Sequence, residues 1–409
     1  METSKKHYNR LKQGFLYEMD FLSNVGNKMF VCPFVDRSKL STYCYYVTYS
    51  LLFLTCTQLF VTLCLTESKD WFEIINIAPN FGVCIMILNK YGKIHANRKL
   101  YDGIFKHFQN DLWEAIADSI SHRRILSKYT KITRIIIRFQ FYYSAVLAVV
   151  VNCFPRIIMY IENDVLNNEK TNLYPFDGWY PFDKTEWYYT AYVWESFMTT
   201  LVIFIYAFVN MIHISYTRYI CMELKILGNS TEILITEEDV ENIKTMEAAE
   251  RAHAYIKRKT KFIIVRHQYL AKITSDLNLV LGDAMLLTYM FGSVFICLTV
   301  FTATVVDSFY MSLRYFSFFC SLLVDVFIQC IMGQLLIDHS EQLERAIYFA
   351  DWPGADPVTQ KMLLIFLTRA QKPFIFSAKN YLTMNLDTFS GICSLSYQFF
   401  NLLRTAYSE

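Results

Sequence analysis

The chain has 409 residues, of which 54% are hydrophobic, 17% aromatic and only 19% charged. This composition is too apolar for an ordinary soluble enzyme and indicates a membrane protein. The formal net charge of +2 is informative only when the charges are followed along the chain. None of the eleven cysteines form a Cys-x-x-Cys pair, and most lie in apolar runs, so buried free thiols are expected.

Seven segments are predicted to cross the membrane as helices. A helix needs roughly 20 mostly apolar residues to span the hydrocarbon layer. The segments that meet this test are Thr42–Leu65, Phe72–Asn89, Ile135–Tyr160, Trp187–Ile214, Leu277–Phe301, Phe309–Ile337 and Leu382–Leu403. The apolar run 362–367 is too short to span and is followed by charged residues and Pro373, so it is predicted to be a helix packed against protein.

The distribution of Lys and Arg predicts the orientation. Residues 1–40, 90–138 and 213–275 are rich in both, whereas the connection 161–186 contains only Lys170 and Lys184 beside six acidic residues. Basic residues collect on the cytoplasmic side of a membrane. The fold class is therefore all-α integral membrane, with seven transmembrane helices, a cytoplasmic N-terminus and an extracellular C-terminus.

No sequence motif indicates an enzyme. The zincin, phosphate-loop, nucleophile-elbow and dinucleotide-binding motifs are absent, and the histidines lack metal-ligand spacing. No catalytic residue, cofactor or metal is therefore expected. The basic cluster 257–261 follows the acidic stretch 236–250, which favours solvated helix faces or contact with acidic lipid headgroups over nucleic acid.

Three acidic residues lie within predicted spans: Glu195, Asp283 and Asp325. Ionisable groups are costly in the hydrocarbon layer and usually face a partner, a cavity or water. Structural pairing and a functional role remain equal alternatives for each.

Aromatic residues collect in the outer halves of the spans, as in WYYTAYVWESF (187–197) and FYMSLRYFSFF (309–319). Tyr188, Tyr192, Glu195 and Thr199 recur at three- or four-residue spacing and share one helix face. An interfacial belt with helix packing, and a ligand pocket, are both consistent with this pattern, and periodicity alone favours the first.

The C-terminal part of the chain, 348–404, resembles the end of an insect odorant receptor. The matching pieces are Asp351-Trp352, the apolar helix that leads to Arg369-Ala370-Gln371-Lys372-Pro373, Leu386 through Phe389, and Ser396-Tyr397 followed by apolar residues and Leu403-Arg404. In the related gustatory receptors a Thr-Tyr pair precedes Gln-Phe by five residues, whereas Tyr397-Gln398-Phe399 is contiguous here, so the odorant branch fits better.

The resemblance implies an odorant-gated, non-selective cation channel, usually a heterotetramer with the shared co-receptor subunit. The implied partners are a small hydrophobic odorant, the lipid bilayer, and permeating monovalent and divalent cations, with no nucleic acid. The implied location is the plasma membrane of an olfactory sensory neuron dendrite. The short loop between spans four and five is typical of a ligand-tuning subunit rather than the longer co-receptor.

The resemblance also implies a division of the chain. Residues 1–41 form a cytoplasmic N-terminal segment, 42–337 the first six spans with ligand-binding outer halves, 338–381 a cytoplasmic anchor segment with a short helix, and 382–409 the pore-lining helix and a short external tail. The implied pore and gate residues are Tyr397, Phe400, Leu403 and Arg404. The ligand-binding residues expected from depth and helix face are Phe72, Asn76, Val149, Cys153, Tyr188, Tyr192, Glu195, Tyr289, Tyr310 and Phe316.

Three alternatives stay open beside the channel subunit: a metabotropic seven-helix receptor, a gustatory receptor of the same superfamily, and a transporter. A metabotropic receptor has the opposite orientation, and Thr217-Arg218-Tyr219 follows the fourth span rather than the third, so Arg218 is interpreted as an anchor at the cytoplasmic face. A transporter is expected to contain internal repeats, and none is visible.

Overall fold

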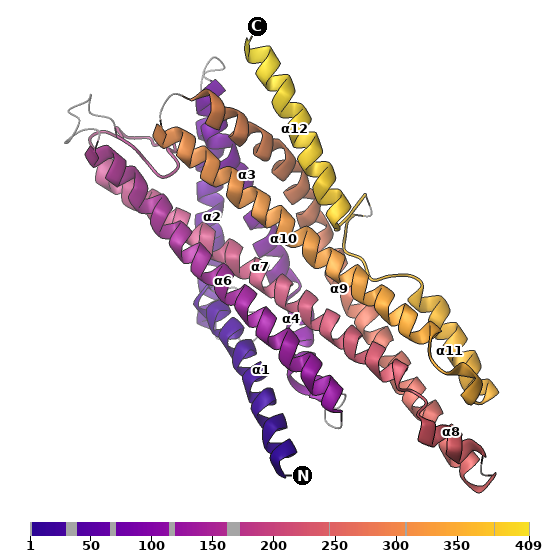
Figure 1. Ribbon diagram of the computed structural model, residues 1–409. Coiled ribbons are helices and arrows are strands. Elements are labelled where there is room, and N and C mark those ends of the chain that lie inside the picture. Colours follow the sequence, from indigo (N-terminus) through magenta and orange to yellow (C-terminus); the bar gives the residue numbers. More distant parts are fainter. Residues whose placement is uncertain are drawn as a thin grey trace.

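The computed structural model describes residues 2–29, 39–65, 71–113, 119–161, 172–244, 246–306, 309–379 and 381–408. Nearly all of the described chain is helical, and the helices lie side by side in an elongated bundle (Figure 1). In chain order the elements are α1 (Glu2–Lys28), α2 (Lys39–Leu65), α3 (Trp71–Ala96), α4 (Arg98–Lys106), the π-helix η1 (His107–Asp111), α6 (Ile120–Tyr160), α7 (Tyr188–Glu232), α8 (Glu237–Lys244), α9 (Met246–Val305), α10 (Phe309–Tyr348), the 3₁₀ helix η3 (Trp352–Gly354), α11 (Pro357–Ala370), β1 (Ser377–Ala378), β2 (Leu382–Thr383) and α12 (Leu386–Ser408).

Six of the described helices are long and apolar enough to cross a membrane: α2, α3, α6, α7, α9 and α10. These correspond to the first six predicted spans. The seventh predicted span, α12, is not among them, because Ser, Thr, Asn and Arg side chains lower its hydropathy. The count of seven spans and the orientation of the termini stay predictions.

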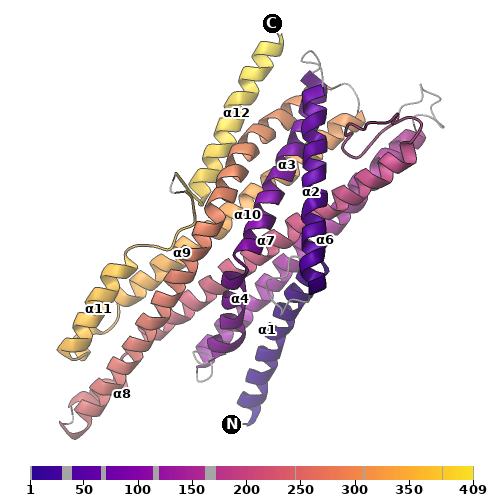
Figure 2. The ribbon, with the colours of Figure 1, turned by 180° about the vertical axis from the view of Figure 1, so that it is seen from behind.

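The two ends of the chain lie at opposite ends of the bundle, as Figures 1 and 2 show from two sides. The N-terminus of α1 lies near the end that carries α8 and α11, whereas α12 extends to the other end. The end with α8 and α11 is called the anchor end below, and the opposite end is called the outer end.

Helix α7 is the central element and packs against α1, α2, α3, α6, α9 and α10. From Ile205 to Leu227 almost every residue is buried, whichever face of the helix it occupies. A mostly apolar helix of this kind is stable inside a bundle, and its buried Glu223 is paired with Arg266 of α9 at 2.7 Å. The core therefore lies in the middle of the bundle and toward the anchor end.

Several helices extend beyond the predicted spans. The third, fourth, fifth and sixth spans were predicted from apolar runs, but α6 begins at Ile120, α7 ends at Glu232, α9 begins at Met246 and α10 ends at Tyr348. The extensions contain charged residues on exposed faces and buried residues at helical spacing, such as Ile256, Ile263 and Leu270 of α9. A sequence search for uninterrupted apolar runs does not detect these amphipathic extensions.

The N-terminal segment also contains an amphipathic helix, α1. Phe15, Met19 and Leu22 are buried at three- and four-residue spacing. Their helix packs against α6 and α7. The buried Glu18 carboxylate forms an ion pair with Arg134 of α6 at 2.8 Å. The two helices are therefore held together by an ion pair as well as by apolar contacts.

The predicted short helix around 362–367 is present as α11. Its first turn has Pro357 and the N-cap Asp356, whose Oδ2 accepts from the Val358 N–H at 3.2 Å. Leu363 and Phe366 are buried against the bundle, as expected for a helix packed on protein.

The last helix begins later than predicted. Residues 382 and 383 pair as β2 with β1, with Ser377 opposite Thr383 and Ala378 opposite Leu382. Helix α12 then starts at Leu386, where the Asn385 side chain accepts from the Thr388 N–H at 2.8 Å. The prediction that this helix begins at Leu382 was therefore wrong, because the strand pairing uses the first two residues.

Candidate functional site

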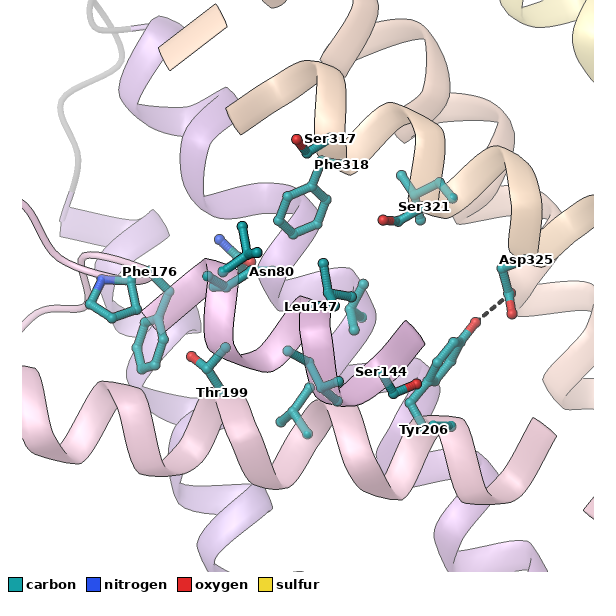
Figure 3. Close-up of a pocket in the computed structure, with 18 of the residues that line it drawn as sticks. Asn80, Ser144, Leu147, Phe176, Thr199, Tyr206, Ser317, Phe318, Ser321 and Asp325 are labelled. Atoms are coloured by element: carbon teal, nitrogen blue, oxygen red, sulfur yellow. Dashed lines mark hydrogen bonds between the residues drawn. The ribbon is translucent and has the colours of Figure 1, made fainter. Parts of the chain in front are cut away.

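A cavity of about 330 Å³ lies inside the outer half of the bundle (Figure 3). Helices α2, α3, α6, α7 and α10 enclose it, and Pro175 and Phe176 of the connection between α6 and α7 close one end. Lining residues recur at helical spacing on each wall, as Thr199, Val202 and Tyr206 do on α7. One face of each helix therefore contributes to the cavity.

The cavity wall is mainly apolar, with a few polar groups at defined positions. Aliphatic and aromatic side chains dominate, which is typical of sites for small apolar ligands. The residues that line the cavity are Thr55, Leu59, Asn80, Val83, Cys84, Gln140, Tyr143, Ser144, Leu147, Val150, Val151, Phe154, Pro155, Pro175, Phe176, Met198, Thr199, Val202, Ile203, Tyr206, Ala207, Leu313, Arg314, Ser317, Phe318, Ser321, Leu322, Val324, Asp325 and Ile328.

At the deep end of the cavity the Asp325 carboxylate accepts several hydrogen bonds. The Tyr206 hydroxyl donates to it from α7 (Figure 3), and Asn210 Nδ2 donates from the next turn of the same helix at 2.7 Å. Gln329 Nε2, one turn further along α10, donates at 2.7 Å. The ammonium of Lys90 lies 4.7 Å from the centroid of the Tyr206 ring. Helices α3, α7 and α10 thus meet at this polar cluster.

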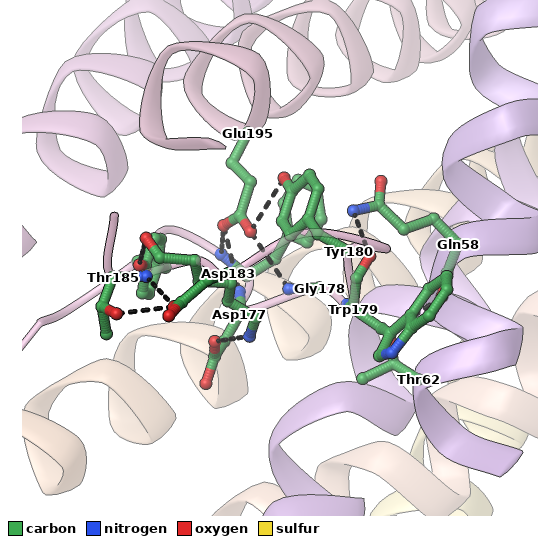
Figure 4. Close-up of polar contacts among 12 residues, drawn as sticks. Gln58, Thr62, Asp177, Gly178, Trp179, Tyr180, Asp183, Thr185 and Glu195 are labelled. Atoms are coloured by element: carbon green, nitrogen blue, oxygen red, sulfur yellow. Dashed lines mark hydrogen bonds and ion pairs between the residues drawn. The ribbon is translucent and has the colours of Figure 1, made fainter. Parts of the chain in front are cut away.

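At the outer end, Glu195 of α7 binds the backbone of the α6–α7 connection. Its carboxylate accepts from the N–H groups of Phe176, Asp177 and Gly178 at 2.9, 3.0 and 3.0 Å (Figure 4). Asp177 has a positive φ of 56°, and such a left-handed residue makes successive N–H groups converge on an anion. The Tyr180 hydroxyl adds a contact to the same carboxylate at 3.3 Å.

Other helices hold the same connection, which we call the lid segment (172–187). Arg314 of α10 donates to the Pro175 carbonyl at 2.9 Å. On α2, the Thr62 hydroxyl accepts from the Trp179 N–H at 2.9 Å, and Gln58 Nε2 donates to the Trp179 carbonyl at 3.1 Å. The lid segment is therefore attached to α2, α7 and α10 at once.

Contacts within the lid segment fix its shape. Burial, together with the nearby Asp177 carboxylate, raises the pKa of Tyr174 to about 12. The protonated Tyr174 hydroxyl donates to the Lys184 carbonyl at 3.0 Å. The Lys184 ammonium in turn pairs with Asp177 at 2.8 Å.

None of the expected ligand residues whose side chains the structure describes line the cavity. Val149, Cys153 and Phe316 are exposed on the outside of the bundle. Each is one position from a lining residue, namely Val150, Phe154 and Ser317. Phe72 and Tyr310 lie in α3 and α10, but their side chains are outside the described residues. Their role in ligand binding stays a prediction.

The remaining expected ligand residues have structural partners. Tyr188 and Tyr192 pack with Tyr174 and Ala191 in a separate small cluster. The Tyr192 hydroxyl donates to the Asn152 carbonyl. Glu195 is fully buried against the lid segment, and Tyr289 is buried with its hydroxyl 3.7 Å from Cys330 Sγ. Asn76 is different: its backbone carbonyl accepts from Asn80 Nδ2 at 3.1 Å, but its side-chain Oδ1 is buried with no hydrogen-bond partner among the described residues.

The expected pore and gate residues all lie in the outer half of α12. This helix packs against α9 and α10, with Ile392 buried and the Ser396 hydroxyl donating to the Ser293 carbonyl at 3.0 Å. Beyond Ser396 the helix is largely uncovered: Tyr397 is 65% exposed, Phe400 and Leu403 are half-buried, and Arg404 is exposed. Within the described residues, no group of three or more His, Cys, Asp or Glu side chains could hold a metal ion.

Known proteins with a similar sequence or structure identify the family of this chain. A family model described as 7tm Odorant receptor matches residues 73–397. The putative odorant receptor 85d of Drosophila melanogaster is 36% identical over 147 residues, which cover 35% of each chain. Odorant receptor 67a of the same organism is 31% identical over 150 residues, or 37% of each chain. The chain thus spans about a third of the length of these curated relatives.

Among solved structures, the insect olfactory receptor OR5 from Machilis hrabei in complex with eugenol has a TM-score of 0.77 with 16% sequence identity. The match covers 98% of this chain and 99% of that one, so the two share a fold along almost their whole length. Because the family model covers most of the chain, this multi-pass membrane protein belongs to the 7tm odorant receptor family.

Proposed function

We propose that this chain is the odorant-binding subunit of a ligand-gated, non-selective cation channel in the plasma membrane. The subunit assembles as a heterotetramer with the shared co-receptor, in the sensory dendrite. The observation that carries the proposal is the apolar cavity enclosed by α2, α3, α6, α7 and α10 under the lid segment.

The cavity suits a small hydrophobic molecule. Its volume of about 330 Å³ is at the lower end of the range for ligand sites, and its wall is mainly aliphatic and aromatic. Burial of apolar ligand surface supplies affinity without covalent chemistry. A volatile compound with a compact apolar body is the expected ligand.

A path for gating runs from the cavity to α12. Helix α10 lines the cavity and continues to Gly333, which lies against Met384 at the start of the turn into α12. A ligand that binds the open arrangement better than the closed one shifts the equilibrium by that difference in affinity. In this proposal α12 lines the pore, Phe400 forms the apolar gate, and Tyr397, Leu403 and Arg404 lie around it.

The proposal is tested by recording whole-cell currents from cells that express the chain together with the co-receptor. We expect one or more volatiles of a broad panel to open a cation current. Val202→Trp fills the cavity from α7 and is expected to abolish that current. Val193→Trp, at a position on the same helix that is 67% exposed, is the matched control and is expected to keep it.

Two results would contradict the proposal. The first is a full response of the Val202→Trp variant, which would exclude this cavity as the ligand site. The second is a ligand response that needs a G protein and persists without any current through the receptor, which would support the metabotropic alternative.

A further inference from the structure

At the deep end of the cavity, the Asp325 carboxylate can accept a further hydrogen bond. A carboxylate offers about four acceptor positions. Among the described residues, Asp325 Oδ2 accepts from Tyr206 and Gln329, whereas Oδ1 accepts only from Asn210. Asp325 is partly exposed and lines the cavity, so the remaining acceptor position is available to a molecule inside it.

Several other polar groups of the wall are already hydrogen bonded within the protein. The hydroxyls of Tyr143 and Ser321 lie 2.9 Å apart and hydrogen bond to each other. Ser144 donates to the Gln140 carbonyl at 2.8 Å, and Ser317 donates to the Leu313 carbonyl at 2.8 Å. These bonds satisfy the hydroxyls locally, which leaves the Asp325 carboxylate as the strong acceptor at this end of the cavity.

A buried lysine lies beside this cluster, on the face of the Tyr206 ring. Lys90 of α3 is 5% exposed, and its ammonium lies over the ring of the same Tyr206 that donates to Asp325. A buried charge is costly unless an opposite charge is close. Because the Lys90 side chain already places one basic group at this cluster, a cationic ligand would bring a second one, whereas a neutral donor would not.

We propose that Asp325 accepts a hydrogen bond from a neutral hydroxyl group of the ligand, so that the cavity selects alcohols or phenols. The apolar body of such a ligand lies against the walls formed by α6, α7 and α10, and its hydroxyl points to the deep end. The role of this hydrogen bond in odorant detection rests on the proposed function. The binding preference itself does not, because it is measured on the purified receptor without recording a current.

The test compares a medium-chain primary alcohol with the methyl ether of equal heavy-atom number, which accepts but does not donate a hydrogen bond. Binding of both is measured with the purified full-length receptor by ligand-induced thermal stabilisation. A hydrogen bond to a charged acceptor predicts roughly 10- to 100-fold tighter binding of the alcohol. A primary amine of the same length is expected to bind more weakly than the alcohol.

Asp325→Asn is expected to remove the preference for the alcohol. The amide keeps the size of the side chain, but its single carbonyl oxygen has two acceptor positions. The donors of Tyr206, Asn210 and Gln329 already outnumber them, so none is left for the ligand. The control is Asp338→Asn on the same helix but outside the cavity wall, where the carboxylate accepts from Gln334 Nε2 at 2.8 Å. This control is expected to keep the preference.

The outcomes separate the inference from the proposed function. Equal binding of alcohol and ether by the unmodified receptor overturns the inference and needs no variant that folds. An equal loss of binding for both compounds in Asp325→Asn also overturns it, because Asp325 then acts only in helix packing. Stronger binding of the amine refutes the charge argument. If the purified receptor prefers the alcohol but no odorant opens a current with the co-receptor, the proposed channel function fails while the inference stands.

Discussion

Glu195 is a single residue whose partner could not be read from the sequence. Its place within an apolar segment predicts a partner, a cavity or water. The structure shows that the partner is the backbone of the lid segment, at 2.9 to 3.0 Å from three consecutive N–H groups. Glu195 therefore closes the outer end of the cavity by holding the main chain beside Phe176.

Glu195→Gln is expected to loosen the lid segment. In the unmodified protein the three N–H donors share two carboxylate oxygens, whereas the amide offers them only one carbonyl oxygen. A buried donor left unpaired lowers the free energy of unfolding by about 1–3 kcal/mol. We expect faster hydrogen–deuterium exchange of the backbone amides at 176–178 in the purified receptor. Glu186→Gln, at an exposed position of the same segment, is the matched control. Unchanged exchange in Glu195→Gln would show that the other attachments of the lid segment are sufficient.

The residues of the cavity wall were only partly predictable. The periodic face of the fourth span included Thr199, and Asp325 was identified as an acid within a span; both line the cavity. The other candidates were placed by depth and aromatic character. One residue along a helix rotates the side chain by about 100°, and this separates exposed Val149 from lining Val150. The rotation of each helix depends on packing with its neighbours, which a single sequence does not reveal.

At the scale of elements, the hairpin β1–β2 joins the end of α11 to α12 and packs closely against α9 and α10. Gly282 of α9 and Gly333 of α10 allow this close approach. A Cβ on Gly333 would lie 2.2 Å from the Met384 carbonyl oxygen, and one on Gly282 would lie 3.3 Å from the Lys379 nitrogen. The Asp283 carboxylate also pairs with Lys379 of the hairpin at 2.7 Å and with Lys93 of α3. The start of α12 is thus fixed to α3, α9 and α10.

Gly333→Ala is expected to destabilise the protein although alanine favours helix. In an unhindered helix this change stabilises by roughly 0.5–1 kcal/mol, but here the methyl group clashes with backbone that cannot rotate away. We expect a lower Tm of the purified receptor. Gly103→Ala in α4 is the control, since no described atom outside its own stretch of helix lies within 4 Å of the added Cβ, and it is expected to raise the Tm or leave it unchanged. A Tm of Gly333→Ala equal to that of the control would contradict the tight packing.

The elements themselves were largely predictable, because length and hydropathy identify helices that cross a membrane. The six spans correspond to α2, α3, α6, α7, α9 and α10. Their amphipathic extensions were missed because charged residues interrupt the apolar runs. The hairpin was missed because its strands are two residues each, and such short pairing depends on the glycines of other helices.

At the scale of the whole molecule, the orientation in the membrane stays a prediction. The termini lie at opposite ends of the bundle, and Lys and Arg concentrate in the segments predicted to be cytoplasmic. An epitope tag at the N-terminus is therefore expected to bind antibody only after the cells are permeabilised. A tag after Glu409 is the control and is expected to bind antibody on intact cells. Labelling of the N-terminal tag on intact cells would overturn the orientation and with it the channel proposal.

The continuity of helix α10 links the cavity to the hairpin before α12. It is continuous from Phe309 to Tyr348, and eight residues, or about 12 Å at 1.5 Å per residue, separate Asp325 at the deep end of the cavity from Gly333 at the hairpin. Over so short a distance an α-helix behaves as a stiff rod. In the proposed gating, α10 alone therefore joins the cavity to the hairpin that precedes α12, and a displacement at Asp325 moves the helix backbone that Met384 contacts.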